Sequence, residues 1–265
     1  MQYETEGASF LPYRSTPPTT VRAVERALDI LLCFTKSTHE LSLSEIARDV
    51  GLHKSTAHRL LLSLQQKGFV RRHPGSDKYM LGWSALCLSA NAPLFDSWTS
   101  VALPTMEELR DRTGETVSLY VRSGIERIRV QAVESREPIR NVATVGERYP
   151  LYIGASGKVL LAWSDVDLLD EILRRERLPS GFSVNELQLQ LQQVRADGYA
   201  VSIQERDAGA AAMAAPVFGP DGDCIAALAV SGPVSRLTEA KMENLVSHLL
   251  GAAQTLSKAI ANASR

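Results

Sequence analysis

Apolar residues between positions 41 and 82 are spaced first as in two short helices and then as in two strands. Ser42 and Glu45 stand three residues apart, which is the spacing of a capping box at the start of a helix. Gly51 can adopt the left-handed conformation that ends a helix. The first helix is therefore predicted to begin at Ser42 and to end just before this glycine.

The second helix is predicted to begin only a few residues later and to have one apolar and one polar face. Its apolar residues recur at i, i+3, i+4 and i+7, which is the period of a helix with one buried side; they are Ala57, Leu60, Leu61 and Leu64. The polar face comprises Lys54, Ser55, Thr56, His58, Arg59, Ser63 and Gln66. Leu62 also points outward, and it either contacts a thymine methyl group or packs beneath the next segment.

A basic hairpin is predicted to follow this helix. Gly68 ends the helix, a strand runs from Phe69 to Arg72, and residues 78–81 return as a second strand after the turn at 74–77. Two capped helices around a turn occur in many helical proteins. The Arg-Arg and Lys-Tyr strands that follow them complete a winged helix-turn-helix, which is typical of DNA binding. The candidate DNA-binding residues are Arg22, Arg26, Lys54, Ser55, Thr56, His58, Arg59, Arg71, Arg72 and Lys78.

The segments on either side of this pattern define four parts of the chain. Upstream, residues 21–34 predict a helix that packs on the other two through Val21, Val24, Leu28 and Leu31. Downstream, Ser84 to Ala90 predict a linker helix that a break at Asn91-Ala92-Pro93 ends. The predicted parts are a disordered lead-in (1–19), a DNA-binding domain (20–82), a linker helix (83–94) and an effector-binding and oligomerisation domain (95–265).

The second domain is predicted to be an α+β structure on an antiparallel sheet, because helical and alternating segments are joined by short turns. Ser183 and Glu186 have the spacing of another capping box, and Gly198 predicts the end of that helix. The predicted helices are 96–112, 183–197 and one that begins at Thr238, and the predicted strands are 116–121, 127–133, 199–204, 211–218 and 224–231.

Composition supports a DNA-binding part attached to an acidic body. The 265-residue chain has a formal net charge of −1, but residues 42–82 hold seven Lys and Arg against three Asp and Glu. The three cysteines are too scattered for a disulfide framework or a cysteine-based metal site, which fits a reducing cytoplasm. No apolar run approaches the roughly 20 residues of a membrane span, and no signal peptide is expected.

The chain resembles the IclR family of bacterial transcriptional regulators from Val21 to Ile260. The matching segments are VRAVERALDIL, LHKSTAHRLL, GERYPLYIGASGKVLLA, RADGYAVSIQERDAG and AAPVFGPDGDCIAALAVSGPVSRLT. The resemblance implies an N-terminal winged helix-turn-helix, a linker helix and a C-terminal GAF-like domain. It further implies that this domain binds a small effector and forms dimers, or dimers of dimers, on operator DNA, without a metal or another cofactor.

Residues 154–158 (Gly-Ala-Ser-Gly-Lys) precede an apolar helix, and the amides at a helix N-terminus favour a carboxylate. A phosphate loop would need glycine at Tyr152 and Ser or Thr at Val159, so ATP is not the expected ligand. Carried over by resemblance and completed by neighbours, the candidate effector site comprises Ala155, Ser156, Ser202, Ala212, Ala229, Ser231, Leu119, Arg148 and Met213. Its small apolar lining predicts a larger, less polar organic acid, such as an aromatic one.

Several alternatives stay open. The small residues could serve only close packing of the sheet on a helix, and Arg148 could be an ion-pair partner instead of a carboxylate anchor. Glu205, Arg206 and Asp207 are expected to form structural salt bridges. No catalytic residues are expected, because four of the five histidines lie in the DNA-binding half and no hydrolase or metal motif is present. A DNA-tethered enzyme and a protein-interaction module are the rival functions.

Overall fold

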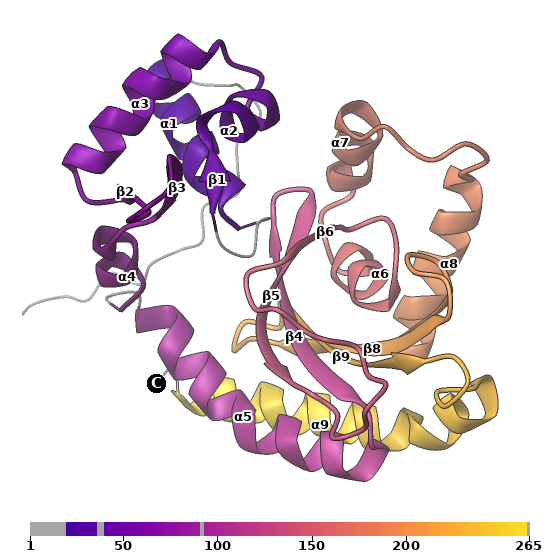
Figure 1. Ribbon diagram of the computed structural model, residues 1–265. Helices are drawn as coiled ribbons and strands as arrows, with labels where there is room; N and C mark the ends of the chain where they lie inside the picture. The colour runs from indigo at the N-terminus through magenta and orange to yellow at the C-terminus, as the bar shows by residue number, and fades with distance from the viewer. Residues whose placement is uncertain (1–19, 36–39, 91–92, 264–265) are drawn as a thin grey trace, which may run out of the picture. The chain divides into compact units, whose positions relative to one another are not determined.

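The computed structural model describes residues 20–35, 40–90 and 93–263. Its contacts divide the chain into two compact units, Met1–Ser89 and Ala90–Arg265 (Figure 1). The predicted disordered lead-in at 1–19 and the predicted break at Asn91-Ala92 lie outside the described residues.

The first unit is a three-helix core with a wing. The capping box is confirmed: the Ser42 N–H donates to Glu45 Oε2 at 2.8 Å, and the Glu45 N–H donates to Ser42 Oγ at 3.3 Å. Gly51 and Gly68 have φ values of 66° and 74°, as the predicted helix ends require. The elements are α1 (Arg22–Cys33), β1 (Leu41–Ser42), α2 (Leu43–Asp49), α3 (Lys54–Gln66), β2 (Val70–Arg72), β3 (Lys78–Leu81) and α4 (Trp83–Ala90).

The predicted buried face of α1 is wrong. Val21, Val24 and Leu28 are 65%, 54% and 53% exposed, whereas Ile30 and Phe34 are 0% and 7% exposed and lie in the core. Of the predicted stripe only Leu31 packs against this core. The helix carries apolar residues on two sides, and its packing on α2 and α3 selects the side that contains Ile30.

Two further features of the first unit differ from expectation. Leu62 is 48% exposed, so the alternative that buries it beneath the wing is wrong. The sequence pattern also missed β1, which pairs with β3 through Leu41 and Tyr79 and adds a third strand to the wing sheet. A two-residue strand has no periodicity of its own, so only its distant partner reveals it.

In the described part of the second unit, six strands form one antiparallel sheet in the order β6-β5-β4-β9-β8-β7. The strands are β4 (Thr116–Ser123), β5 (Glu126–Val133), β6 (Arg148–Pro150), β7 (Ala200–Ile203), β8 (Ala210–Phe218) and β9 (Cys224–Pro233). All of them except β6 were predicted, within a few residues at their ends. The turn that joins β8 to β9 contains Gly222, which has a φ of 83°.

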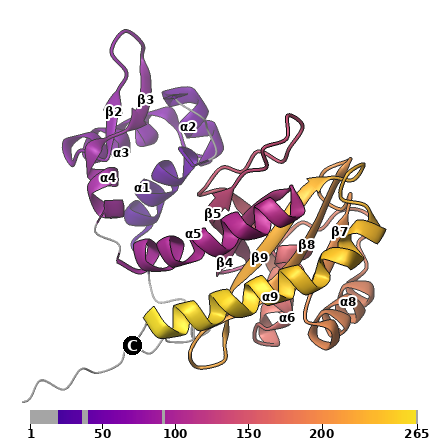
Figure 2. The ribbon, with the colours of Figure 1, turned by 90° about the horizontal axis from the view of Figure 1, so that it is seen from below.

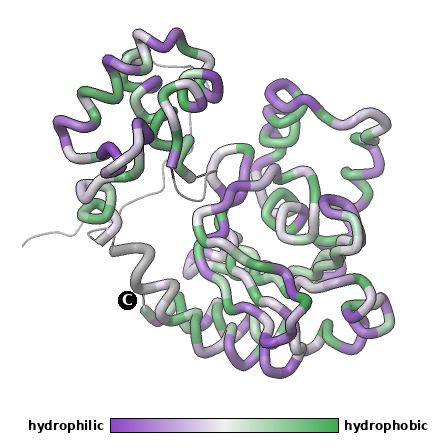
Figure 3. The backbone as a smooth tube through the Cα atoms, in the orientation of Figure 1, coloured by the Kyte–Doolittle hydropathy of each residue, from purple (hydrophilic) through white to green (hydrophobic). Residues whose placement is uncertain are grey.

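Helices cover both faces of this sheet (Figures 1 and 2). The long helices α5 (Pro93–Thr113) and α9 (Glu239–Ala263) pack side by side on one face, and hydrophobic and hydrophilic residues alternate along them (Figure 3). The other face carries α6 (Ala155–Ala162), with α7 (Asp167–Arg175) and α8 (Val184–Asp197) around it. Ser183 caps α8 by accepting from the Glu186 N–H at 3.2 Å, which is one half of the predicted capping box.

The strand residues alternate between two hydrophobic cores. One core joins the sheet to α5 and α9 and includes Leu119 and Met213, both 0% exposed. The other joins the sheet to α6, α7 and α8 and includes Tyr120 and Ala229. Adjacent residues of one strand therefore belong to different cores.

Candidate functional site

The outer face of α3 carries the residues predicted to read DNA. Lys54, Ser55 and Arg59 are exposed, and Thr56 and His58 are half-buried. The opposite face is fixed in the core by Ala57 and Leu61, both 0% exposed. Among the described residues, no carboxylate forms an ion pair with Lys54 or Arg59, so both charges are available to a ligand.

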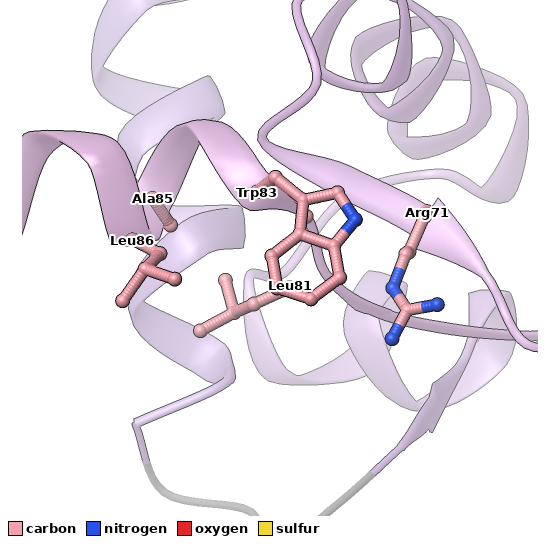
Figure 4. A pocket seen from close by; sticks show the side chains of 6 residues that line it. Arg71, Leu81, Trp83, Ala85 and Leu86 are labelled. Atoms are coloured by element: carbon pink, nitrogen blue, oxygen red, sulfur yellow. The ribbon is translucent and has the colours of Figure 1, made fainter.

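The wing adds three positively charged side chains, of which two form no ion pair among the described residues and one is paired within the hairpin. The Arg71 guanidinium lies 5.6 Å from the centre of the Trp83 ring (Figure 4), and the described residues offer neither it nor Lys78 a carboxylate partner. Arg72 instead donates to the Tyr79 hydroxyl at 3.3 Å, which raises its pKa, and lies 3.5 Å from Asp77. Arg71 and Lys78 therefore form no ion pair within the described part of the chain, although Lys78 lies near enough to Glu45 to help lower the pKa of that carboxyl, whereas Arg72 is held by its own hairpin.

Arg22 and Arg26, the remaining predicted DNA contacts, lie on α1. Arg22 is exposed and Arg26 is half-buried. The structure thus places all ten predicted DNA-binding residues in the first unit, on α1, α3 and the wing.

In the second unit, most of the predicted effector residues meet on the sheet face that α6 covers. Strand register puts Ser202, Ala212 and Ser231 side by side in one row across β7, β8 and β9. Ala229 lies in the adjacent row, opposite Ser118 of β4. Ala155 and Ser156 begin α6 above this face and are 2% and 6% exposed.

Three of the predicted effector residues either lie elsewhere or are already paired within the protein. Leu119 and Met213 lie in the core on the opposite sheet face. Side chains alternate between the two faces along a strand, and these two point away from α6. Arg148 forms an ion pair with Glu126 at 3.2 Å, which is the alternative considered for it from the sequence. We therefore remove Leu119 and Met213 from the candidate site.

The loop before α6 is already bound by a carboxylate of the chain. Glu205 accepts a hydrogen bond from the Gly154 N–H at 2.9 Å and pairs with Lys158 Nζ at 2.6 Å. Lys158 is 4% exposed and also donates to the Val201 carbonyl at 2.8 Å. Lys158 is thus an internal ion-pair partner, and the predicted structural role of Glu205 is confirmed.

Sequence reasoning missed a cluster of arginine and tyrosine side chains beside this loop. Arg127 and Arg129 of β5 are 2% and 0% exposed, and both guanidinium groups lie over the rings of Tyr120 and Tyr149, 5.3 to 5.7 Å from their centres. Burial raises the pKa of Tyr149 to about 12, aided by its hydrogen bond to Glu147. A signal was present: two arginines two positions apart in a predicted strand point to one face.

Among the described residues, a metal-binding cluster and a membrane-spanning helix are both absent. No group of three or more His, Cys, Asp or Glu side chains is arranged to hold a metal ion. No described helix is long and apolar enough to cross a membrane.

Comparison with known proteins gives matches to both units. Family models match residues 23–74 (IclR helix-turn-helix domain) and 98–258 (bacterial transcriptional regulator IclR C-terminal). The HTH-type transcriptional regulator XynR of Escherichia coli (strain K12) is 32% identical over 245 residues, which cover 91% of this chain and 97% of XynR.

Two solved structures are also similar. The IclR transcriptional regulator from Alicyclobacillus acidocaldarius superposes with a TM-score of 0.77 at 28% identity, covering 91% of this chain and 99% of that one. An IclR homolog from Microbacterium hydrocarbonoxydans, complexed with 4-hydroxybenzoate, has a TM-score of 0.75 at 26% identity, with the same coverage of 91% and 99%.

Proposed function

The chain belongs to the IclR family of bacterial transcriptional regulators, and from this we propose that it binds specific operator DNA and that a small organic acid modulates this binding. Members of the family are named as transcriptional regulators and repressors, not as enzymes. The proposal places the protein with the DNA in the bacterial cytoplasm.

The observation that carries the DNA-binding role is the unpaired positive charge on the outer face of α3 and on the wing. Arg59 projects from the face opposite the buried Ala57 and Leu61. An arginine in this position of a recognition helix can donate two hydrogen bonds to a guanine in the major groove. Arg71 and Lys78 are suited to phosphate contacts, since neither forms an ion pair with a carboxylate among the described residues.

Exposed apolar residues in the first unit support a dimer. Val21, which precedes α1, and Val24 and Leu28 of α1 are more than half exposed, and Trp83 and Leu86 of α4 are 70% and 59% exposed. A cavity of about 360 Å³ lies beside Trp83, lined by Arg71, Leu81, Gly82, Trp83, Ala85 and Leu86 (Figure 4). Clustered apolar exposure of this kind is typical of a protein interface. We propose a dimer or a dimer of dimers on DNA.

The effector site is proposed on the sheet face under α6. Small residues there leave α6 close to the sheet, and the first-turn amides of a helix favour a negatively charged group. The 4-hydroxybenzoate bound to the relative from Microbacterium hydrocarbonoxydans supports an aromatic acid as one chemical class to test.

Selection of DNA tests the proposal. The full chain would be used to select binding sequences from a random duplex pool, and affinities would be measured by fluorescence anisotropy at several salt concentrations. We expect a common sequence to emerge and the affinity to fall steeply with salt, because phosphate contacts release counterions. A weak salt response without a common sequence would favour the protein-interaction alternative.

A matched pair of variants locates the contact. Arg59→Ala should lose about 1–3 kcal/mol of binding to the selected sequence, with relaxed preference at one base pair. Arg174→Ala removes an exposed arginine from α7 in the other unit and should leave the affinity unchanged. Equal affinity of Arg59→Ala and the wild type would contradict the assigned role of α3.

A further inference from the structure

Arg127 is a buried cation with incomplete hydrogen bonding. It lies on β5, is 2% exposed, and donates from Nη1 to the Pro150 carbonyl. Its Nε is buried and has no hydrogen-bond partner. Burial lowers the pKa of Arg127 to about 10, so the group is still charged at neutral pH. A buried charge without compensation is costly, so a compensating group is expected.

The charged residues around Arg127 are already paired with one another. Arg129 binds Glu147 at 2.6 Å, Arg206 binds Asp207 at 2.6 Å, Arg148 binds Glu126 at 3.2 Å and Lys158 binds Glu205 at 2.6 Å. Among the described residues no carboxylate lies within ion-pair distance of Arg127. It is the surplus positive charge of this region.

The guanidinium also lies against the N-terminal turn of α6. A Cβ atom on Gly154 would lie 3.0 Å from Nη2 of Arg127, and one on Gly157 would lie 2.5 Å from Nη1, so the absence of both side chains permits the approach. The N-terminal end of a helix carries partial positive charge, and the first amides of α6 have no acceptor within the helix. Glu205 binds this turn only through the Gly154 N–H and pairs with Lys158, so Arg127 itself has no carboxylate among the described residues, and an anion beside it and the first turn of α6 would be stabilised by both.

Ligand entry is possible from the exposed segment 204–209. Arg206 in this segment lies 4.3 Å from the centre of the Tyr149 ring and so covers the cluster from outside. Its only ion-pair partner in the described residues is its neighbour Asp207, and that pair is partly exposed. Moving this side chain would uncover Tyr149 at the cost of one exposed ion pair and one cation–π contact, which contribute about 1 kcal/mol or less each.

We propose that Arg127, with the first turn of α6, binds the carboxylate of the effector. The inference rests on the proposed effector function and names the residue that gives the site its preference for acids. It replaces Arg148, whose charge Glu126 neutralises. Ala229 and Ser118 lie opposite each other on the same sheet face, where the buried Ser118 hydroxyl also has no hydrogen-bond partner and could bind a polar group of the ligand.

The test is thermal unfolding of the full chain with defined probes. Sodium benzoate, 4-hydroxybenzoate and pyruvate would be compared with benzamide, 4-hydroxybenzamide and pyruvamide at equal ionic strength. We expect at least one acid, and not its amide, to raise the melting temperature, because a ligand of the folded state stabilises it. In Arg127→Gln the affinity for that acid should fall on the order of 10- to 100-fold.

Two further arginine variants keep the test specific. Arg122→Gln alters the exposed residue that pairs with Arg127 in strand register, and it should retain the wild-type response to the acid. Arg127→Lys keeps the charge but loses the planar fork, so its response should be weaker than that of the wild type. Without a ligand, Arg127→Gln should melt no lower than the wild type, because the uncompensated charge is gone; a role in core packing alone would instead lower the melting temperature.

Three results would overturn the proposal: no acid of the set stabilises the wild type, Arg127→Gln keeps the full response, or Arg148→Gln loses it in place of Arg127→Gln. The DNA selection distinguishes this failure from that of the proposed function. If the wild type binds selected DNA and no acid acts, only the anchor is wrong. If acids act through Arg127 and no DNA sequence is selected, the DNA-binding role is wrong.

Discussion

Gly157→Ala is expected to destabilise the second unit, although alanine is the better helix former. Gly157 lies in the first turn of α6 and is buried. An added Cβ would collide with the Leu151 carbonyl oxygen and would lie 2.5 Å from Nη1 of Arg127. The carbonyl belongs to the backbone and cannot rotate away, so the helix must shift.

The expected magnitude follows from two opposing effects. Overpacking of a buried site costs about 1–3 kcal/mol. Exchange of glycine for alanine within a helix contributes up to about 1 kcal/mol in the other direction. The free energy of unfolding should therefore fall by about 1–2 kcal/mol.

Gly251→Ala is the matched control. Gly251 lies within α9, and a Cβ added there would meet no atom within 4 Å. Here only the helix preference acts, so the free energy of unfolding should rise by about 0.5–1 kcal/mol.

Urea titration of the full chain, followed by circular dichroism and tryptophan fluorescence, measures both changes. The two variants should differ by about 1.5–3 kcal/mol, which is on the order of 1 M in the urea midpoint. Gly157→Ala as stable as Gly251→Ala would refute the close packing of Arg127 against α6, and with it the geometry of the proposed anchor.

Two other predictions concern carboxylates. Glu115 is 0% exposed and binds Arg236 through two hydrogen bonds of 2.6 and 2.7 Å, so Glu115→Gln should cost about 2–3 kcal/mol in the free energy of unfolding. Glu108 belongs to an exposed ion pair, so Glu108→Gln should cost about 1 kcal/mol or less. Equal losses in urea titration would argue against this difference. The pKa of Glu45 lies below its ordinary 4.5, chiefly because the Ser42 N–H donates to the carboxylate. The resulting stabilisation is present above that value and lost as the pH falls through the lowered pKa, so the difference in unfolding free energy between the wild type and Glu45→Gln should shrink in acid, and a difference that grows would contradict the sign.

Local features of the chain were predictable because they depend on neighbouring residues. The capping box of Ser42 and Glu45, the glycines after α2 and α3, and the buried stripe of α3 involve contacts over a few positions. The same holds for the alternating strands of the second unit and for the polar outer face that carries Arg59. These features were sufficient to predict the winged helix and its DNA partner.

The sequence by itself therefore determined most of the elements, the class of protein and the polar face of α3, whereas tertiary packing decided which sides of those elements are buried and added β1 and β6. Val24 and Ile30 are equally apolar, and only contact with α2 and α3 distinguishes them. Leu119 belongs to one sheet face and Tyr120 to the other. The alternation of side chains along the strand separates the two faces, but it does not show which face α5 covers and which α6 covers. The pairing of β5 with β6 brings Glu126 to Arg148, and the packing of α6 near β5 leaves Arg127 without a carboxylate partner among the described residues. Neither result could be read from the sequence, because electrostatic interactions depend on distance in space and not on separation along the chain.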